Sequence, residues 1–339
     1  MSIAISCTNN DSYKDAKFIS FSDFGNSILL NGTTLEFDDL LMRPVDIIFQ
    51  DSFLIMKNRG TEYHFHVFDP FDKKKKCELI SFGSGPDEMI EPVILSSDDR
   101  FIWILDKEKR AVSKCSLNIS SDTSYINILK KVDISEYADK AAILSDESII
   151  SVVLNPMMKR FCIFNNIGQL VNNFGEYPEC NLDLTMYEKM EAFFCDFIIN
   201  HEKQKIFMSY KQTDLIDIYN LEGQLIKRMH GPDVFLPFVK QEQNGDYIKV
   251  KSQYGKTRDA YFVPRSAKNE VFVLYSGRVY DRDIVSYLNN TILVFDWEGN
   301  PIRAYKLDEP IYSFDVDYNN RTIYALSDNP DFHVIKYSY

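Results

Sequence analysis

The chain has 339 residues, of which 45% are hydrophobic, 26% are charged and 14% are aromatic. This is the composition of a folded globular protein, and the abundance of Phe and Tyr favours β-strands over helices. The formal net charge of −12 repels the phosphate backbone of nucleic acids and anionic lipid surfaces, so nucleic acid is not expected as a partner.

Residues 1–17 are expected to form a tether or the remnant of a secretion signal, ahead of one folded domain at 18–339. Residues 4–6, Ala-Ile-Ser, precede Cys7 and resemble the end of a bacterial lipoprotein signal, in which the cysteine receives the lipid. The apolar stretch is too short for a complete signal or a membrane span. Two hypotheses stay open: a lipoprotein of the periplasm or outer membrane that contacts the membrane only through Cys7, or a cytoplasmic protein that starts at Met1.

A repeated pattern of strands begins near residue 45. In each copy, two short apolar or alternating segments are followed by a hairpin, which predicts four strands per unit. The clearest hairpins have glycine in the turn, because glycine accepts the positive φ of a tight turn. These hairpins occupy residues 160–174, 214–229 and 290–305.

Equivalent positions on the third strands give the period of the repeat. The spacings between them are 48, 48, 55, 76 and 42 residues. The positions are Phe68, Ser116, Phe164, Tyr219, Phe295 and Tyr337. Four-stranded units of roughly 40–50 residues are typical of propeller blades. The sequence therefore predicts an all-β chain that folds as a six-bladed β-propeller.

The last unit supplies three strands, at residues 311–317, 321–326 and 333–337. Its fourth strand has no candidate in the C-terminal part of the sequence. Residues 28–37 precede the first complete unit, and we expect this N-terminal strand to pair with the last unit and close the ring.

Two segments depart from the repeat. Residues 183–194 have apolar side chains at helical spacing with Asp183 in a capping position, which predicts a short helix over one face of the ring. The interval of 76 residues is expected to hold an insertion in which residues 246–250 pair with 259–263 as a long outer hairpin. The alternative is a seventh blade in this interval.

Residues 81–88, Ser-Phe-Gly-Ser-Gly-Pro-Asp-Glu, connect the first unit to the second. The pattern Phe-Gly-x-Gly-Pro-x-Glu at such a junction, with repeated Phe-Asp-x-x-Gly hairpins, resembles the bacterial TolB-like six-bladed propeller family. The resemblance covers the whole repeat layout, although residues 173–178 and 230–233 are eroded copies of the junction. It implies a secreted or lipid-anchored protein with a binding role and no established enzyme activity. Because the junction lacks the fingerprint of a phosphate-binding loop, we expect a structural turn.

Three expected innermost strands begin with an acid in a similar setting: Asp46, Asp196 and Asp315. Innermost strands line the channel of a propeller, so these carboxylates are candidate ligand-binding residues that would attract a cation or a basic ligand. The more common explanation is that each carboxylate accepts hydrogen bonds from backbone amides at a turn.

The sequence assigns no cofactor, no catalytic residue and no metal site. His64 and His66 alternate on one strand and form the best pair of metal ligands, but no third ligand is indicated and an exposed strand face explains them more simply. The six cysteines form no Cys-x-x-Cys pair, and a bond between Cys180 and Cys195 stays open.

These patterns predict a non-enzymatic binding or scaffold protein of the bacterial cell envelope. Its partner would be an unidentified peptide, glycan or envelope protein. The alternative hypothesis is a metal-dependent hydrolase or lyase with its site in the central channel.

Overall fold

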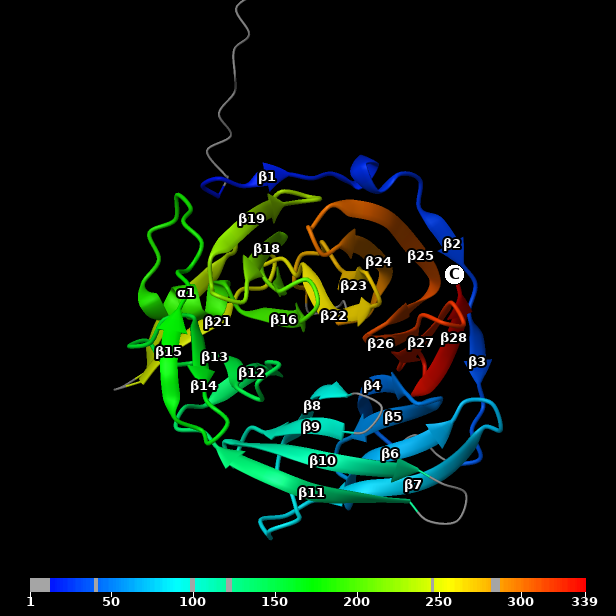
Figure 1. Ribbon diagram of the computed structural model, residues 1–339. Helices are drawn as coiled ribbons and strands as arrows, with labels where there is room; N and C mark the ends of the chain where they lie inside the picture. The colour runs from blue at the N-terminus through cyan, green and yellow to red at the C-terminus, as the bar shows by residue number, and fades with distance from the viewer. Residues whose placement is uncertain (1–12, 40–41, 98–100, 120–123, 245–246, 282–286) are drawn as a thin grey trace, which may run out of the picture.

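A computed structural model describes residues 13–39, 42–97, 101–119, 124–244, 247–281 and 287–339. In this part of the chain, six sheets stand around a central axis as the blades of a propeller (Figure 1). The strands of each blade follow one another outward from the axis. The prediction of an all-β six-bladed propeller is confirmed. The N-terminal residues assigned to a tether, including Cys7, lie mostly outside the described residues.

The blades are numbered in chain order, and their strands run from the innermost to the outermost. Blade 1 comprises β4 (Pro44–Gln50), β5 (Phe53–Asn58), β6 (Tyr63–Asp69) and β7 (Lys74–Ser81). Blade 2 comprises β8 (Pro92–Ser97), β9 (Phe101–Asp106), β10 (Ala111–Ile119) and β11 (Ser124–Asp133). Blade 3 comprises β12 (Ala138–Ile143), β13 (Ile149–Val153), β14 (Phe161–Phe164) and β15 (Leu170–Phe174).

The second half of the chain forms three further blades. Blade 4 comprises β16 (Cys195–Asn200), β17 (Lys205–Tyr210), β18 (Leu215–Asn220) and β19 (Leu225–His230). Blade 5 comprises β22 (Tyr261–Ala267), β23 (Glu270–Tyr275), β24 (Asn289–Asp296) and β25 (Pro301–Ile311). Blade 6 comprises β26 (Ser313–Asp317), β27 (Thr322–Ser327), β28 (His333–Ser338) and the N-terminal β3 (Thr33–Leu35). The six positions used to count the repeat all lie on the third strand of their blades.

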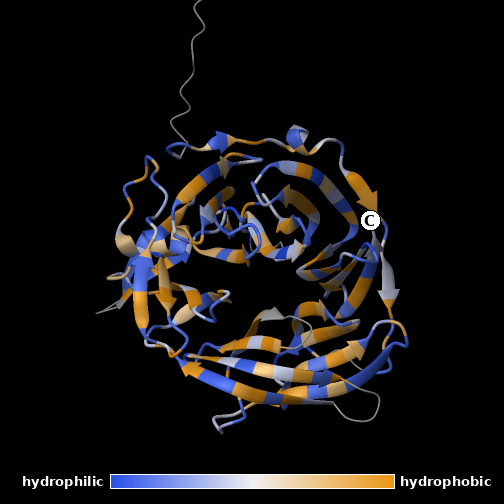
Figure 2. Cartoon of the chain, viewed as in Figure 1, coloured by the Kyte–Doolittle hydropathy of each residue, from blue (hydrophilic) through white to orange (hydrophobic). Residues whose placement is uncertain are grey.

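The core is divided among the spaces between neighbouring blades. Successive side chains of a strand point to opposite faces, and on β9 this sends Ile102 and Ile104 toward blade 1 but Trp103 and Leu105 toward blade 3. The middle strands are therefore apolar on both faces, as the orange bands on the blades in Figure 2 show. Burial of each such side chain stabilises the fold by about 1.5–3 kcal/mol. Because every blade shares its core with two neighbours, the ring must close for all of this surface to be buried.

The N-terminal segment closes the ring as expected. Within residues 28–37, β3 pairs antiparallel with β28, and Leu35 lies opposite Val334. Upstream of β3, the strand β2 (Ile28–Leu30) pairs in parallel with β25, and β1 (Lys17–Phe18) pairs in parallel with β19. A short 3₁₀ helix, Phe21–Phe24, lies between them. We call residues 17–35 the N-terminal strap, because they run along the outer edges of blades 4, 5 and 6 (Figure 1).

The predicted helix exists, but its start was placed too early. Helix α1 covers Met186–Ala192 and is capped by Thr185, whose hydroxyl accepts a hydrogen bond from the Glu188 amide. The Glu188 carboxylate in turn accepts from the Thr185 amide. This capping box satisfies two of the amides that a helix N-terminus leaves free, so Asp183 is not the cap. The helix packs against the hairpin described next.

The long interval holds an insertion, but the expected strand pairing was wrong. Strand β21 (Tyr247–Ser252) pairs with β20 (Val239–Asn244), whereas β22 begins within residues 259–263 and is the innermost strand of blade 5. Two strands that are adjacent in sequence pair at a lower entropic cost than distant ones. The polar sequence of β20 and β21 suits a hairpin outside the core, while buried Tyr261 and Ala267 hold β22 inside it.

Within the described residues, no helix has the length and apolarity needed to cross a membrane. The cysteines that the structure describes are free thiols, which include Cys180 and Cys195. The bond that the sequence left open between these two residues is therefore absent from the described fold.

Candidate functional site

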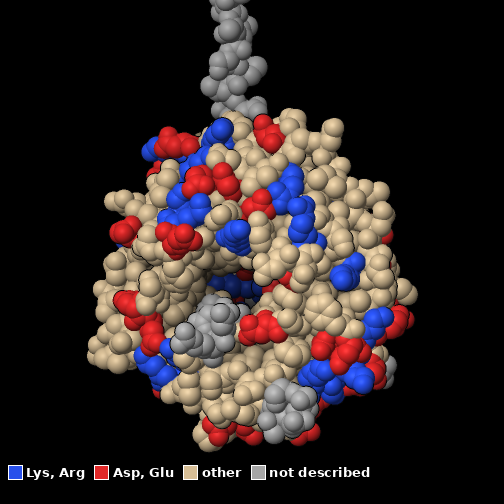
Figure 3. Space-filling view, turned by 45° about the vertical axis from the view of Figure 1, so that its right-hand side comes forward, with Lys and Arg blue, Asp and Glu red and all other residues tan. Residues whose placement is uncertain are grey.

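A pocket of about 430 Å³ lies at the centre of the ring, where the innermost strands face one another. Every blade contributes to its lining: β4 and β5, β8, β12, β16, β22 and β26 all present side chains to it. Figure 3 shows this opening, with Lys and Arg side chains visible in its depth. The charged residues that line it are Asp46, Lys57, Arg59, Glu91, Lys107, Asp139, Lys140, Asp196, Lys211 and Arg265.

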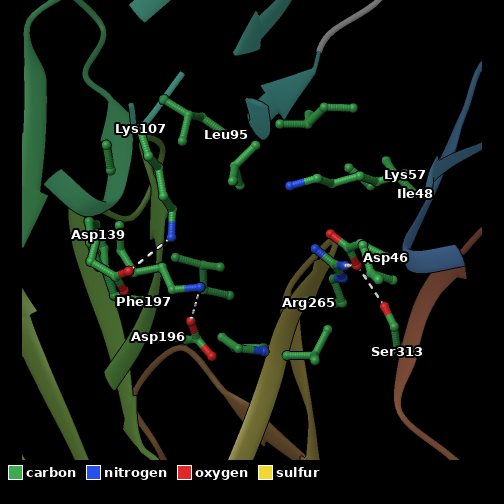
Figure 4. A pocket seen from close by; sticks show the side chains of 18 of the residues that line it. Asp46, Ile48, Lys57, Leu95, Lys107, Asp139, Asp196, Phe197, Arg265 and Ser313 are labelled. Atoms are coloured by element: carbon green, nitrogen blue, oxygen red, sulfur yellow. Dashed lines mark hydrogen bonds and ion pairs between the residues drawn. The ribbon is translucent and has the colours of Figure 1, made fainter. Parts of the chain in front are cut away.

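Asp46 joins three blades at one side of the pocket. Its carboxylate lies 2.6 Å from the Arg265 guanidinium of blade 5 and accepts a hydrogen bond of 2.6 Å from the Ser313 hydroxyl of blade 6 (Figure 4). It also accepts from the Ile47 amide. Arg265 donates in addition to the Phe314 carbonyl. Burial alone would lower the pKa of Arg265, but the carboxylates of Asp46 and Asp315 outweigh it and raise that pKa.

Asp315 lies behind this cluster rather than in the pocket lining. Its carboxylate accepts hydrogen bonds from the backbone amides of Phe49, at 2.8 Å, and Val316, at 2.9 Å. Burial raises the pKa of Asp315 above its ordinary value, against the opposing effect of Arg265. The backbone role that the sequence left as the more common explanation is the one seen here, and it ties β26 of blade 6 to β4 of blade 1.

Asp196 forms the opposite side of the pocket together with two lysines. Its carboxylate lies 2.7 Å from Lys140 Nζ of blade 3 and 3.3 Å from Lys211 Nζ, which follows β17 in its own blade. Burial opposes ionisation of this carboxyl group, but the two ammonium groups together hold the pKa of Asp196 well below its usual range. Next to this cluster, Lys107 donates to Asp139 at 2.8 Å (Figure 4).

The three predicted acids therefore do not form a ring of free carboxylates. Asp46 and Asp196 lie in the pocket, each neutralised by bases, and Asp315 lies outside the lining. Sequence reasoning missed the bases, because they come from different blades and no spacing connects them. With six bases and four acids, the lining carries a formal charge of +2 in a chain of −12. A ligand-binding role for Asp46, Asp196 and Asp315 stays a prediction.

Two bases of the pocket form no ion pair with any residue that the structure describes. No ion pair or hydrogen bond within the described part of the chain involves the side chains of Lys57, at the end of β5, or Arg59, just after it. Figure 4 shows the Lys57 side chain extending into the pocket. Burial is the main cause that lowers the pKa of Lys57. The charges of Arg59 and Lys107 act in the same direction, and the carboxylates of Glu91 and Asp46 oppose them. An anion bound here would relieve this unfavourable environment.

His64 and His66 do not lie on an exposed strand face, contrary to expectation. Both side chains are buried in blade 1. His64 Nε2 lies 2.8 Å from the Met89 carbonyl oxygen, and His66 lies 3.9 Å from the Glu78 carboxylate. Burial lowers the pKa of both imidazoles. Among the described residues, no group of three or more His, Cys, Asp or Glu side chains could hold a metal ion, so the metal-dependent hydrolase or lyase has no supporting site there.

The glycine-rich junction between blades 1 and 2 is a closed structural turn. The Glu88 carboxylate accepts a hydrogen bond of 2.8 Å from the Gly85 amide, and Lys109 Nζ donates to the carbonyls of Gly85 and Glu88. A side chain at Gly83, whose φ is +159°, would collide with the Glu88 carboxylate. The Glu88 carboxylate therefore packs closely against Gly83 and Gly85, which explains why the pattern combines two glycines with a glutamate.

The chain is similar to known proteins in sequence family and in fold. Residues 23–319 match a family described as TolB-like 6-blade propeller-like, and no curated protein matches the chain. A member of the DUF4221 family from Bacteroides vulgatus has a TM-score of 0.60 and 9% identity over 92% of this chain and 97% of its own. A candidate exported protein from Bacteroides fragilis has a TM-score of 0.51 and 12% identity over 96% of this chain and 98% of its own. At these identities, the structural likeness shows the fold alone.

Proposed function

Because this chain belongs to the TolB-like six-bladed propeller family, we propose that it is a non-enzymatic binding protein of the bacterial cell envelope that holds its ligand in the central pocket. The observation that carries the proposal is the pocket itself, with a volume of about 430 Å³ and a lining drawn from all six blades. Cavities of roughly 300–1,000 Å³ accommodate small organic ligands or the end of a larger one.

The chemistry of the lining favours binding over catalysis. Among the described lining residues, the hydroxyl group of Ser313 donates to Asp46, and neither a cysteine nor a histidine accompanies it. Nucleophilic catalysis needs a nucleophile with a base in hydrogen-bond reach, and an aspartate already paired with Arg265 is a poor base. The ion pairs instead hold charged groups in fixed positions, which suits recognition of a charged ligand.

Val45 gives a direct test of the binding site. Its side chain lines the pocket on β4 but belongs to none of the hydrophobic clusters found among the described residues. We expect Val45→Trp to fill the pocket and leave the fold intact. Val171→Trp is the matched control, because Val171 is 58% exposed on the outermost strand of blade 3.

The test is a thermal-shift screen with small peptides, glycan fragments and organic anions. Compounds that raise the Tm of the wild-type protein and of Val171→Trp should not raise the Tm of Val45→Trp. If the same compounds stabilise all three proteins equally, the central pocket is not the binding site.

The envelope location is supported by the family and by the order of residues 4–7, and it has its own test. Cells that express the full-length gene with its native upstream sequence are fed a radiolabelled fatty acid. We expect label on the wild-type protein in the membrane fraction and none on Cys7→Ser. An unlabelled wild-type protein in the cytosol would contradict the proposal of a lipid-anchored envelope protein.

A further inference from the structure

A second cavity opens between blades 1 and 2, beside the central pocket. Its volume is about 650 Å³. It shares Lys57, Arg59 and Glu91 with the central pocket, so these residues stand where the two cavities meet. A ligand anchored at this point can extend from the channel into the cavity between the blades.

The shared residues carry one more positive than negative charge, because Lys57 and Arg59 stand with the single acid Glu91. Four bases of the central pocket form ion pairs with Asp46, Asp139 and Asp196. The charged lining residues that remain are Lys57, Arg59 and Glu91. Glu91 is not within ion-pair distance of either base in the described structure. The junction therefore offers two cationic donors, and charge-assisted hydrogen bonds to an oxyanion are about twice as strong as neutral ones.

Besides the charged side chains of Lys57, Arg59, Glu91 and Glu108, the second cavity is lined by aromatic and apolar side chains. Phe82 lines it and is 60% exposed, with its ring centroid 5.7 Å from that of His64. His64 is fixed in place by its contact with the Met89 carbonyl oxygen. Ile90 adds a further apolar surface. An exposed ring held beside a fixed imidazole provides a flat face against which another apolar or aromatic group can stack.

We propose that the ligand is an organic anion whose carboxylate, phosphate or sulfonate group binds Lys57 and Arg59 at the junction of the two cavities, and whose apolar or aromatic part lies against Phe82. The inference rests on the proposed function, and it names the class of ligand that the central pocket accepts. It also explains why an acidic protein carries a cationic surplus at the axis of its ring.

The test uses two fluorescent probes with the same aromatic skeleton, anilinonaphthalene sulfonate and the uncharged phenylnaphthylamine. We expect the sulfonate to bind the wild-type protein more tightly. Lys57→Met should weaken sulfonate binding at least about tenfold, which corresponds to one lost charge pair, and leave binding of the uncharged probe unchanged. Lys57→Arg keeps the charge and should keep most of the affinity.

Matched controls separate the site from general effects of charge and exposure. Lys131→Met removes an exposed lysine from the outermost strand of blade 2, and it should bind both probes as the wild-type protein does. Phe82→Ala should weaken the binding of both probes. Phe71→Ala is the control, because Phe71 is 63% exposed in another turn, and it should leave the binding of both probes unchanged.

Three results would overturn the inference: equal binding of the two probes, equal sulfonate affinity in Lys57→Met and Lys131→Met, or no binding of either probe to the wild-type protein. Each is distinct from failure of the proposed function. If the thermal-shift screen finds neutral or cationic compounds whose effect Val45→Trp abolishes, the central pocket is a binding site but its ligand is not an organic anion.

Discussion

Asp217 and Arg228 form a buried bidentate ion pair in blade 4. Both nitrogen–oxygen distances are 2.7 Å, and the Asp217 side chain is fully buried. Tyr210 donates to the same carboxylate at 2.7 Å, and Arg160 donates to the Tyr210 hydroxyl at 2.7 Å. The network therefore extends from blade 4 to blade 3 through buried side chains. The Asp217 carboxylate is the acceptor for both Arg228 and Tyr210, so its loss leaves the buried charge of Arg228 without a partner.

We predict that Asp217→Ala lowers the free energy of unfolding by about 3–5 kcal/mol, because it leaves Arg228 charged and buried. The double substitution Asp217→Leu with Arg228→Met should recover a large part of this loss, since it removes both charges. Urea denaturation measures both effects. A loss below about 1 kcal/mol in Asp217→Ala, the range of exposed ion pairs, would show that the network does not stabilise the fold.

The pocket acid Asp196 predicts a dependence of stability on pH. Its pKa lies below the ordinary value of 3.8 in the folded chain, because Lys140 and Lys211 outweigh the effect of burial. A carboxyl group with a lowered pKa stabilises the fold above its unfolded pKa, and this contribution disappears as the pH falls from about 3.8 toward the folded value. We expect Asp196→Asn to lose less stability than the wild-type protein between about pH 4 and pH 2.

Denaturation at a series of pH values checks this prediction. Asp331→Asn is the control, because Asp331 is exposed and lies outside the pocket. Between about pH 4 and pH 2, the free energy of unfolding of Asp331→Asn should fall as steeply as that of the wild-type protein. If the free energy of unfolding falls equally with pH in Asp196→Asn and in the wild-type protein, the prediction is wrong.

The N-terminal strap is the part of the chain that holds the ring closed. Gly32 lies between β2 and β3, and its amide is 3.1 Å from both carboxylate oxygens of Asp308. A Cβ atom at this position would lie 2.3 Å from Ile335 Cγ2 and 2.8 Å from the Tyr337 ring. The close approach of the strap to β28 therefore requires glycine.

We predict that Gly32→Val displaces the strap from blade 6 and lowers the Tm by several degrees, as expected for a loss of about 1–3 kcal/mol from an overpacked contact. Asn31→Val is the control, since Asn31 is exposed. Hydrogen exchange should show faster exchange of the β3 and β28 amides in Gly32→Val. Equal protection of these amides in both variants would mean that the strap does not depend on this contact.

The sequence predicts the blades better than the insertion. Third strands such as those with Phe68 and Phe164 follow a period that the chain repeats, and the missing fourth strand points to residues 28–37. The pairing of β20 with β21 has no repeat to support it. The helix start was placed too early because Asp183 and Thr185 are both residue types that cap helices. Only Thr185 is followed three residues later by a glutamate, which completes a capping box.

The closed propeller explains why the acids of the pocket could be predicted from the sequence and the bases could not. Asp46 and Asp196 occupy equivalent places in the repeat, so their position on innermost strands was predictable. Lys57, Lys140 and Arg265 come from the second strand of blade 1 and the first strands of blades 3 and 5. These bases come together only when the ring closes, and their spacing in the sequence does not indicate that they are neighbours. The polarity of the pocket is thus a property of the closed propeller.

The most direct test of the central pocket as a ligand site is a crystal structure of the protein with anilinonaphthalene sulfonate. The predicted result is electron density at the junction of the two cavities, with the sulfonate within hydrogen-bond distance of Lys57 Nζ and the aromatic rings against Phe82. Density for the probe elsewhere on the protein, with both cavities empty of it, would show that these cavities are not the ligand site.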